Sequence, residues 1–268
     1  YGQQNESFPL QYVRQIPGLH GVVGALFDVP VGEVWPLDKI FALKREVESS
    51  GLRLETIESV NVHEDIKLGL PSRDRYIENY ILTLQNLAQA GINVVCYNFM
   101  PVFDWTRTEL AKTLPDGSQV LAYDARILRD LTPEKMAAKM QQDAKGVMLT
   151  GWEKERLQSL QLLFDKYKHI DEDALFANLG YFLRAIIPLA ETCGIKMAIH
   201  PDDPPWSVFG LPRITTCQAN LQRIVDLVDS PSNGLTLCSG SLGANPANDI
   251  PAIIRHFGKH GRLHFGHV

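Results

Sequence analysis

The fold is decided by a helix and a strand that follow one another in residues 171–200, DEDALFANLGYFLRAIIPLAETCGIKMAIH. The long apolar stretch from Asp171 to Cys193 has the length and spacing of a helix. Gly194 is a natural stop after it. Ile195 to His200 is then a short apolar run of the kind that forms a buried strand. The segment therefore predicts one helix followed directly by one strand that ends on a histidine.

The same alternation extends in both directions along the chain. Strands are predicted over Gly21 to Phe27, Leu52 to Ser59, Ile92 to Phe99, Ile195 to His200, Leu235 to Cys238 and Leu263 to His267. Helices are predicted over Leu37 to Ser50, Ser72 to Ala90, Asp171 to Cys193, Thr216 to Asp229 and Asp249 to Phe257. Such alternation implies an α/β fold, with a parallel sheet and helices outside it. The Gly-rich motif of dinucleotide folds does not follow the first strand, so a closed (β/α)8 TIM barrel is favoured.

A long excursion interrupts this rhythm after the third strand. It covers about residues 104–170 and holds a turn at Pro115-Asp116-Gly117, with helical patterns near Pro133 to Ala144 and Glu153 to Lys168. Excursions of this length are often lids or binding elements, and a surface insertion is the alternative.

We treat residues 1–268 as a single barrel domain. The pattern contains six strand-and-helix units, so we expect the last strands of an eight-stranded barrel to be missing from this chain.

The composition narrows the class of protein. The net charge of −5 gives no reason to expect a nucleic acid partner. The sequence contains no run of about 18 apolar residues, so no membrane span is predicted. No leader is visible either, and no membrane partner is expected. The four cysteines form no CxxC pair, which indicates a reduced, cytoplasmic protein.

Three successive predicted strands end in His200, Cys238 and His267. In a parallel barrel, the carboxyl ends of the strands share one rim, where catalytic residues lie. Imidazole and thiolate groups are good ligands for a borderline divalent metal. A lone histidine or cysteine there would more often be structural, but three in succession predict a metal site with a position left for substrate.

Other polar residues at this rim are weaker candidates for binding or catalysis: His63, Asn98, Trp105, Arg107 and Asp202. His63 follows the second strand and either reaches the substrate or caps a loop. Arg107 suits a substrate carboxylate, although a structural salt bridge is equally plausible. Asp202 lies between prolines beside His200, where it either contacts substrate or holds the His200 ring.

Several longer motifs resemble those of the mannonate dehydratases of hexuronate degradation. They are Ile199-His200-Pro201-Asp202-Asp203-Pro204-Pro205, Phe209-Gly210-Leu211-Pro212-Arg213, residues 28–35 (DVPVGEVW), residues 97–107 (YNFMPVFDWTR) and residues 62–67 (VHEDIK). The resemblance covers essentially the whole chain. It implies a xylose-isomerase-like barrel and a lyase that removes water from D-mannonate, a small sugar acid, to give 2-keto-3-deoxy-D-gluconate.

The resemblance also implies one Mn(II) or Fe(II) ion held by His, Cys, His and Asp, of which the first three map onto His200, Cys238 and His267. The fourth ligand and the general base are expected beyond Val268. A sugar isomerase on the same barrel, or an incomplete barrel that binds a sugar acid without turnover, are the alternatives. A homodimer is expected only because barrel enzymes often dimerise.

Overall fold

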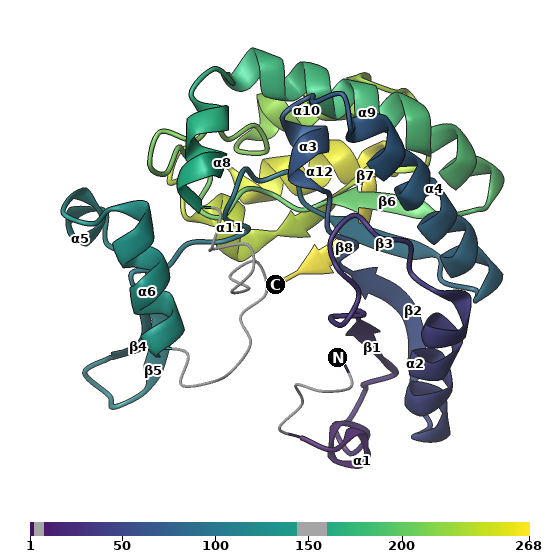
Figure 1. The fold of residues 1–268 in the computed structure, drawn as a ribbon. Helices are drawn as coiled ribbons and strands as arrows, with labels where there is room; N and C mark the ends of the chain where they lie inside the picture. Colours follow the sequence, from purple (N-terminus) through teal and green to yellow (C-terminus); the bar gives the residue numbers. More distant parts are fainter. Residues whose placement is uncertain (3–7, 144–159) are drawn as a thin grey trace.

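The computed structural model describes residues 1–2, 8–143 and 160–268. Its main sheet has the strand order β1-β2-β3-β6-β7-β8, and every neighbouring pair is parallel. The strands are β1 Gly21–Gly24, β2 Arg53–Glu58, β3 Val94–Tyr97, β6 Lys196–Ile199, β7 Asn233–Cys238 and β8 Leu263–His267. All six predicted strands are confirmed: β1, β2, β3 and β6 are shorter than predicted, β7 begins two residues earlier, and β8 has the predicted bounds. The sheet curves as part of a barrel (Figure 1).

Helices cover the outer face of this sheet, as the alternation predicted (Figure 1). They are α2 Leu37–Ser49, α4 Arg73–Gln89, α9 Glu172–Thr192, α10 Gln218–Asp226 and α12 Ile250–Lys259. Short helices occur at α1 Leu10–Val13, α3 Glu64–Lys67 and α11 Ser239–Gly243. Gly51 and Gly91 follow α2 and α4 with φ of 76° and 72°, the left-handed conformation that ends helices.

Helix α9 is the most deeply buried of these helices. Nine of its residues are buried, Phe182 and Ile186 among them. It packs against α4 and β6. By length and composition alone, α9 also meets the criteria for a membrane-spanning helix. Its position in the core accounts for that hydropathy, because a helix covered on one side by a sheet and on another by a helix is apolar over much of its surface.

The excursion after β3 forms a separate layer. It contains a hairpin of β4 Glu109–Thr113 and β5 Gln119–Ala122, then α5 Ala125–Arg129, α6 Pro133–Asp143 and α8 Leu160–Tyr167. The hairpin, α5 and α6 stand at one side of the barrel (Figure 1). The turn at Pro115-Asp116-Gly117 and the helix near Pro133 are confirmed. Of the predicted helix over 153–168, the part from Leu160 to Tyr167 is confirmed as α8, and residues 153–159 lie outside the described part.

The hairpin strands themselves were not predicted. Their side chains are largely exposed, so they lack the alternating apolar face by which a strand is recognised. The excursion has its own small core, which includes Phe103, Met136, Met140 and Leu163. It therefore packs as a unit beside the barrel.

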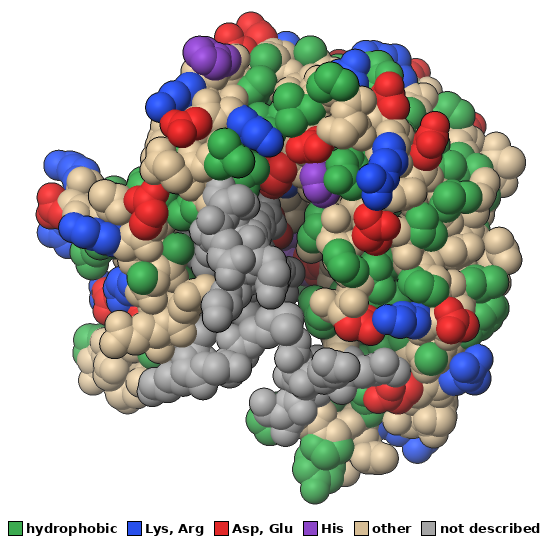
Figure 2. Space-filling view, viewed as in Figure 1, with side chains coloured by type: hydrophobic (Ala, Val, Ile, Leu, Met, Phe, Trp, Pro, Cys, Tyr) green, Lys and Arg blue, Asp and Glu red, His purple; other side chains and the backbone are tan. Residues whose placement is uncertain are grey.

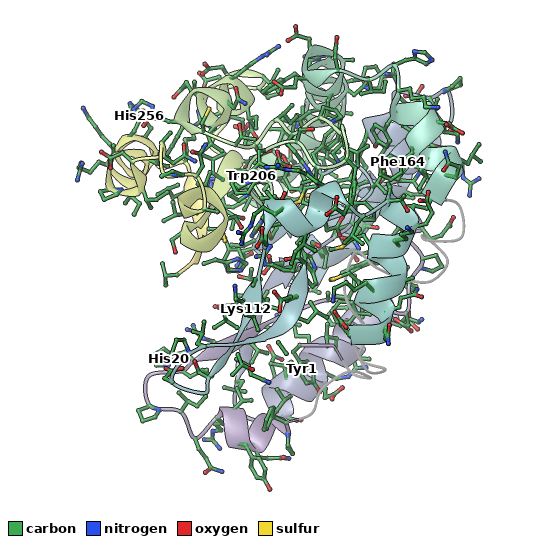
Figure 3. The ribbon with its side chains drawn as sticks, turned by 90° about the vertical axis from the view of Figure 1, so that its left-hand side faces the viewer. Tyr1, His20, Lys112, Phe164, Trp206 and His256 are labelled. Carbon is green, nitrogen blue, oxygen red and sulfur yellow. The ribbon has the colours of Figure 1, made fainter. Side chains whose placement is uncertain are left out.

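Several contacts attach the excursion to the segment that follows β6, an ion pair between Arg107 and Asp203 among them. Trp105 forms a β-bridge with Asp203, and the indole nitrogen of Trp206 donates to the hydroxyl of Tyr123 at 3.2 Å. In Figure 3 the hairpin, marked by Lys112, extends away from Trp206. The excursion is thus attached next to the strand end that carries His200.

Candidate metal centre

The side chains of His200, Cys238 and His267 converge at the carboxyl ends of β6, β7 and β8. Each offers a ligand atom, and these atoms all lie within 4.8 Å of one another. Cys238 and His267 are register partners across β7 and β8, and His200 follows the last residue of β6. The parallel sheet itself therefore brings together the three residues selected from the sequence.

Hydrogen bonds orient both imidazole rings. The Nδ1 atom of His200 lies 2.7 Å from the carbonyl oxygen of Pro201. The Nε2 atom of His200 faces Nδ1 of His267 at 3.3 Å. The remaining nitrogen of His267, Nε2, lies 2.9 Å from Oε2 of Glu58. Each ring thus has one nitrogen directed to an outer acceptor and one directed to the other ring.

When no metal is bound, the electrostatics favour a thiolate at Cys238 beside a cationic ring at His267. Burial raises the pKa of Cys238, but hydrogen bonds with His200, His267 and Ser241 lower it to about 5. The hydrogen bonds with Cys238 and Glu58 raise the pKa of His267 to about 10. Burial lowers the pKa of His200, yet the hydrogen bond and charge of Cys238 leave it raised.

Glu58, the last residue of β2, is a site residue that sequence reasoning missed. Burial raises its pKa, but the hydrogen bond and charge of His267 and the charge of His200 leave it lowered. Its Oε1 atom accepts a hydrogen bond from the thiol of Cys96 at 3.6 Å. The sequence pattern predicts Glu58 only as part of a strand. The signal that could have found it is a carboxylate at a strand's carboxyl end, where this fold places its chemistry.

A cavity of about 310 Å³ lies beside the cluster. Its lining residues are Glu58, Ser59, Cys96, Tyr97, Asn98, Met100, Asp104, Trp105, His200 and Asp203. Two of the weaker candidates, Asn98 and Trp105, therefore lie at this cavity. The side-chain oxygen of Asn98 accepts a hydrogen bond from the backbone nitrogen of Met100 at 3.2 Å, so the side chain is held in place.

Arg107 and Asp202 take part in structural contacts. Both terminal nitrogens of Arg107 bind the carboxylate of Asp203, at 2.7 and 2.9 Å. The buried carboxylate of Asp202 accepts from the backbone nitrogen of Thr215 at 2.7 Å. It also lies 3.7 Å from the buried guanidinium of Arg213. A role for either residue toward substrate stays a prediction.

His63 lies at a different cavity, of about 520 Å³, between the segments that follow β1 and β2. Its ring stacks on Tyr76 with 3.6 Å between centroids. Its Nδ1 atom accepts from the backbone nitrogen of Asp65 at 3.1 Å and so caps α3. The capping role weighed from the sequence is thus present in the structure. The two cavities share Ser59 in their linings.

Comparisons with known proteins identify the family of this chain. A family model described as D-mannonate dehydratase (UxuA) matches residues 1–268. The mannonate dehydratase of Thermotoga maritima is 60% identical over 268 residues, which is all of this chain and 74% of that protein. The chain belongs to the D-mannonate dehydratase family.

Solved structures show the same fold, and one of them is a mannonate dehydratase. The crystal structure of mannonate dehydratase from Streptococcus suis serotype 2 aligns with a TM-score of 0.88 and 44% identity, over 99% of this chain and 70% of that one. A putative sugar phosphate isomerase/epimerase from Anabaena variabilis aligns with a TM-score of 0.54 at 16% identity, over 96% and 65% of the two chains. That second likeness shows the fold alone. The family match confirms the resemblance inferred from the motifs, and the structural match confirms the TIM-barrel fold. D-mannonate dehydratases are hydro-lyases and depend in general on a metal.

Proposed function

We propose that this protein removes water from D-mannonate to give 2-keto-3-deoxy-D-gluconate, as a step of hexuronate catabolism. One observation carries the proposal: two imidazoles and an acidic thiol converge within 4.8 Å beside a cavity, in a chain of the D-mannonate dehydratase family. His200, Cys238 and His267 hold the metal in this proposal, and the cavity binds the sugar acid.

The donor set fits a divalent metal. Two nitrogens that each bind one ion at about 2.0–2.1 Å can be separated by a distance of this size, and Nε2 of His200 lies 3.3 Å from Nδ1 of His267. The pKa of about 5 at Cys238 makes its sulfur a thiolate at neutral pH, which is the form that binds metals. Three protein donors leave room for further ligands. We propose Mn(II) or Fe(II), as the family resemblance implies.

The reaction breaks the C–H bond at C2, next to the carboxylate, and the C–O bond at C3. A base takes the proton from C2, the electron pair forms the C2–C3 double bond, and the C3 hydroxyl leaves as water after accepting a proton. The resulting enol rearranges to the keto acid. A bound metal supplies Lewis-acid stabilisation of the negative charge that develops on the substrate oxygens.

The residues beside the cluster suit a polyhydroxylated acid. The cavity of about 310 Å³ is at the lower end of the range for small-molecule sites. The side-chain nitrogen of Asn98 carries two hydrogen-bond donors, which match substrate hydroxyls. Trp105 supplies an apolar wall for the C–H groups of the sugar. We keep Asn98 and Trp105 as substrate-binding residues on this basis.

The remaining expectations also stand as proposals. On the face shown in Figure 2, basic and acidic side chains are interspersed, which with the net charge of −5 argues against a nucleic acid partner. All four cysteines, each within the described part, are free thiols, which favours a reducing compartment such as the cytoplasm. A membrane partner is not part of the proposal, and a homodimer rests on the fold class alone.

The experiment that tests the function is incubation of the Mn(II)-loaded protein with D-mannonate, followed by proton NMR. The expected result is one 2-keto-3-deoxy-D-gluconate formed for each D-mannonate consumed. D-gluconate, the epimer at C2, is the control and should react far more slowly. Conversion to an isomeric sugar acid without loss of water would favour the isomerase alternative. Binding without any conversion would favour the incomplete barrel.

A further inference from the structure

The His267 ring lies between a carboxylate, Glu58, and a second imidazole, His200. Its Nε2 atom faces Oε2 of Glu58 at 2.9 Å, and its Nδ1 atom faces Nε2 of His200 at 3.3 Å. The two ring nitrogens point in different directions. The imidazole therefore lies between the Glu58 carboxylate on one side and His200 and Cys238 on the other.

This arrangement selects one tautomer of His267. A carboxylate can only accept a hydrogen bond, so Nε2 of His267 must carry the hydrogen in this contact. In a neutral imidazole the other nitrogen then has a free lone pair. Metal binding requires the neutral ring, so when His267 gives up its second proton the lone pair left on Nδ1 is directed at the cluster, and Glu58 is the group that directs it there.

His200 has the complementary arrangement. Its Nδ1 atom faces the carbonyl oxygen of Pro201 at 2.7 Å, which can likewise only accept. The lone pair of the neutral ring is then on Nε2, the atom that faces His267. Two acceptor nitrogens at 3.3 Å repel one another unless a cation lies between them. The outer hydrogen bonds thus prepare the inner atoms for a cation.

The Glu58 carboxylate is itself held in place through the oxygen that does not face His267. The thiol of Cys96 donates to its other carboxylate oxygen, Oε1, at 3.6 Å. Cys96 is the register partner of Glu58 across β2 and β3, and its sulfur lies 3.3 Å from the hydroxyl of Thr236 on β7. The hydroxyl of Thr236 donates in turn to the carbonyl oxygen of Ala198 at 3.2 Å. The carboxylate is therefore part of a connected chain of polar groups within the barrel.

We propose that Glu58 is a positioning residue of the metal centre: it accepts the Nε2 hydrogen of His267, fixes the tautomer, and leaves Nδ1 as the metal-binding atom. A carboxylate in this position also makes the imidazole a stronger donor to the metal. Glu58 does not bind the metal itself in this account. The proposal rests on the proposed metal centre, and it assigns a role to a residue that the three ligands alone do not explain.

The test measures the affinity of the metal-stripped protein for Mn(II), by the EPR signal of free Mn(II) during titration. Glu58→Ala removes the acceptor and should weaken Mn(II) binding about 10- to 100-fold. Glu58→Gln keeps a neutral acceptor oxygen and should fall between Glu58→Ala and the wild type. The matched control is Glu55→Gln, the same substitution on the same strand at a side chain that is 54% exposed, and it should leave the affinity unchanged.

A second measurement needs no variant. In the Zn(II)-loaded protein, long-range ¹H–¹⁵N correlation NMR should show the hydrogen of His267 on Nε2 and the metal on Nδ1. Metal on Nε2 would overturn the positioning role. Equal Mn(II) affinity in the wild type, Glu58→Gln and Glu58→Ala would also overturn it, while leaving the metal centre intact. Failure of the wild type to bind Mn(II) at all would overturn both the metal centre and the role of Glu58.

Discussion

Arg107 and Asp203 form a two-pronged ion pair, with Nη1 2.7 Å from Oδ1 and Nη2 2.9 Å from Oδ2. The backbone nitrogen of Thr106 also donates to the carbonyl oxygen of Asp203 at 3.1 Å. The pair joins the start of the excursion to the loop after His200. It therefore fixes one wall of the cavity relative to the metal centre.

Replacing Arg107 should loosen this attachment. Arg107→Lys keeps the charge but loses one of the two hydrogen bonds, and we expect the free energy of unfolding to fall by about 1.5 kcal/mol. Urea denaturation measures the change. The matched control is Arg126→Lys, whose side chain is 83% exposed and pairs with Asp124 in the same excursion. If Arg107 binds the substrate carboxylate instead, its variant would raise KM for D-mannonate with no loss of stability.

Gly32 should be hard to replace, for two separable reasons. Its φ of 89° disfavours any side chain, at a cost of about 1–2 kcal/mol. A Cβ would also lie 2.6 Å from Tyr76 and 2.9 Å from His63. Gly117 has a similar φ of 85° with nothing within 4 Å of a Cβ. Gly32→Ala should thus reduce the free energy of unfolding more than Gly117→Ala, and should shift the NMR signals of the His63 ring. If Gly32→Ala and Gly117→Ala reduced the free energy of unfolding equally, the rings of Tyr76 and His63 would have to move away from the new Cβ at no cost, which would contradict this prediction.

Lys67 is a buried cation, 1% exposed, and its removal should be costly. Its Nζ atom lies 2.9 Å from Oε1 of Glu64 and 2.7 Å from the carbonyl oxygen of Met100. Lys67→Met leaves a largely buried carboxylate without this partner, and we expect a loss of about 3 kcal/mol in urea denaturation. The double variant Lys67→Met with Glu64→Gln should recover part of that loss.

The control for this pair is Lys168, which is 67% exposed and pairs with Asp165. Lys168→Met should change the free energy of unfolding by no more than about 0.5 kcal/mol. Similar effects at Lys67 and Lys168 would contradict the assignment of a structural role to the buried pair.

Cys238 should be a thiolate across the neutral range in the metal-free protein. Its pKa is lowered to about 5 from the usual 9.0, so the charged form persists between these two values, where an ordinary thiol is protonated. Alkylation of the stripped protein by iodoacetamide should therefore stay fast from pH 8 down to about pH 5 and slow below it. A Cys238→Ser variant shows which part of the alkylation occurs at Cys238, because that part is lost in the variant. A rate that falls tenfold for each pH unit below 8 would contradict the lowered pKa.

The sheet and the three candidate ligands could be predicted because both leave strong local patterns. Each of His200, Cys238 and His267 ends an apolar run, and parallel strands bring their carboxyl ends to one rim. The hairpin of β4 and β5 could not be predicted, because its strands are exposed on both faces and only the turn at Gly117 leaves a signature.

Glu58 marks the limit of sequence reasoning at the site. Its role depends on a hydrogen bond to a residue 209 positions away, and no local pattern reports such a contact. The same holds for Arg107, whose partner Asp203 is 96 positions away. Candidates chosen because they follow a strand divide, in the structure, between the metal-site cavity (Asn98, Trp105), a separate cavity (His63) and structural contacts (Asp202, Arg107).

The central claim is that dehydration occurs at a metal held by His200, Cys238 and His267. The most direct measurement is the rate of D-mannonate dehydration by chelator-stripped protein as Mn(II) is added back, in the wild type and in Cys238→Ala. We predict that the stripped wild type is inactive and recovers fully at about one equivalent of Mn(II), whereas the variant stays inactive and binds Mn(II) weakly. Full activity in the stripped wild type, or equal recovery by Cys238→Ala, would contradict the account.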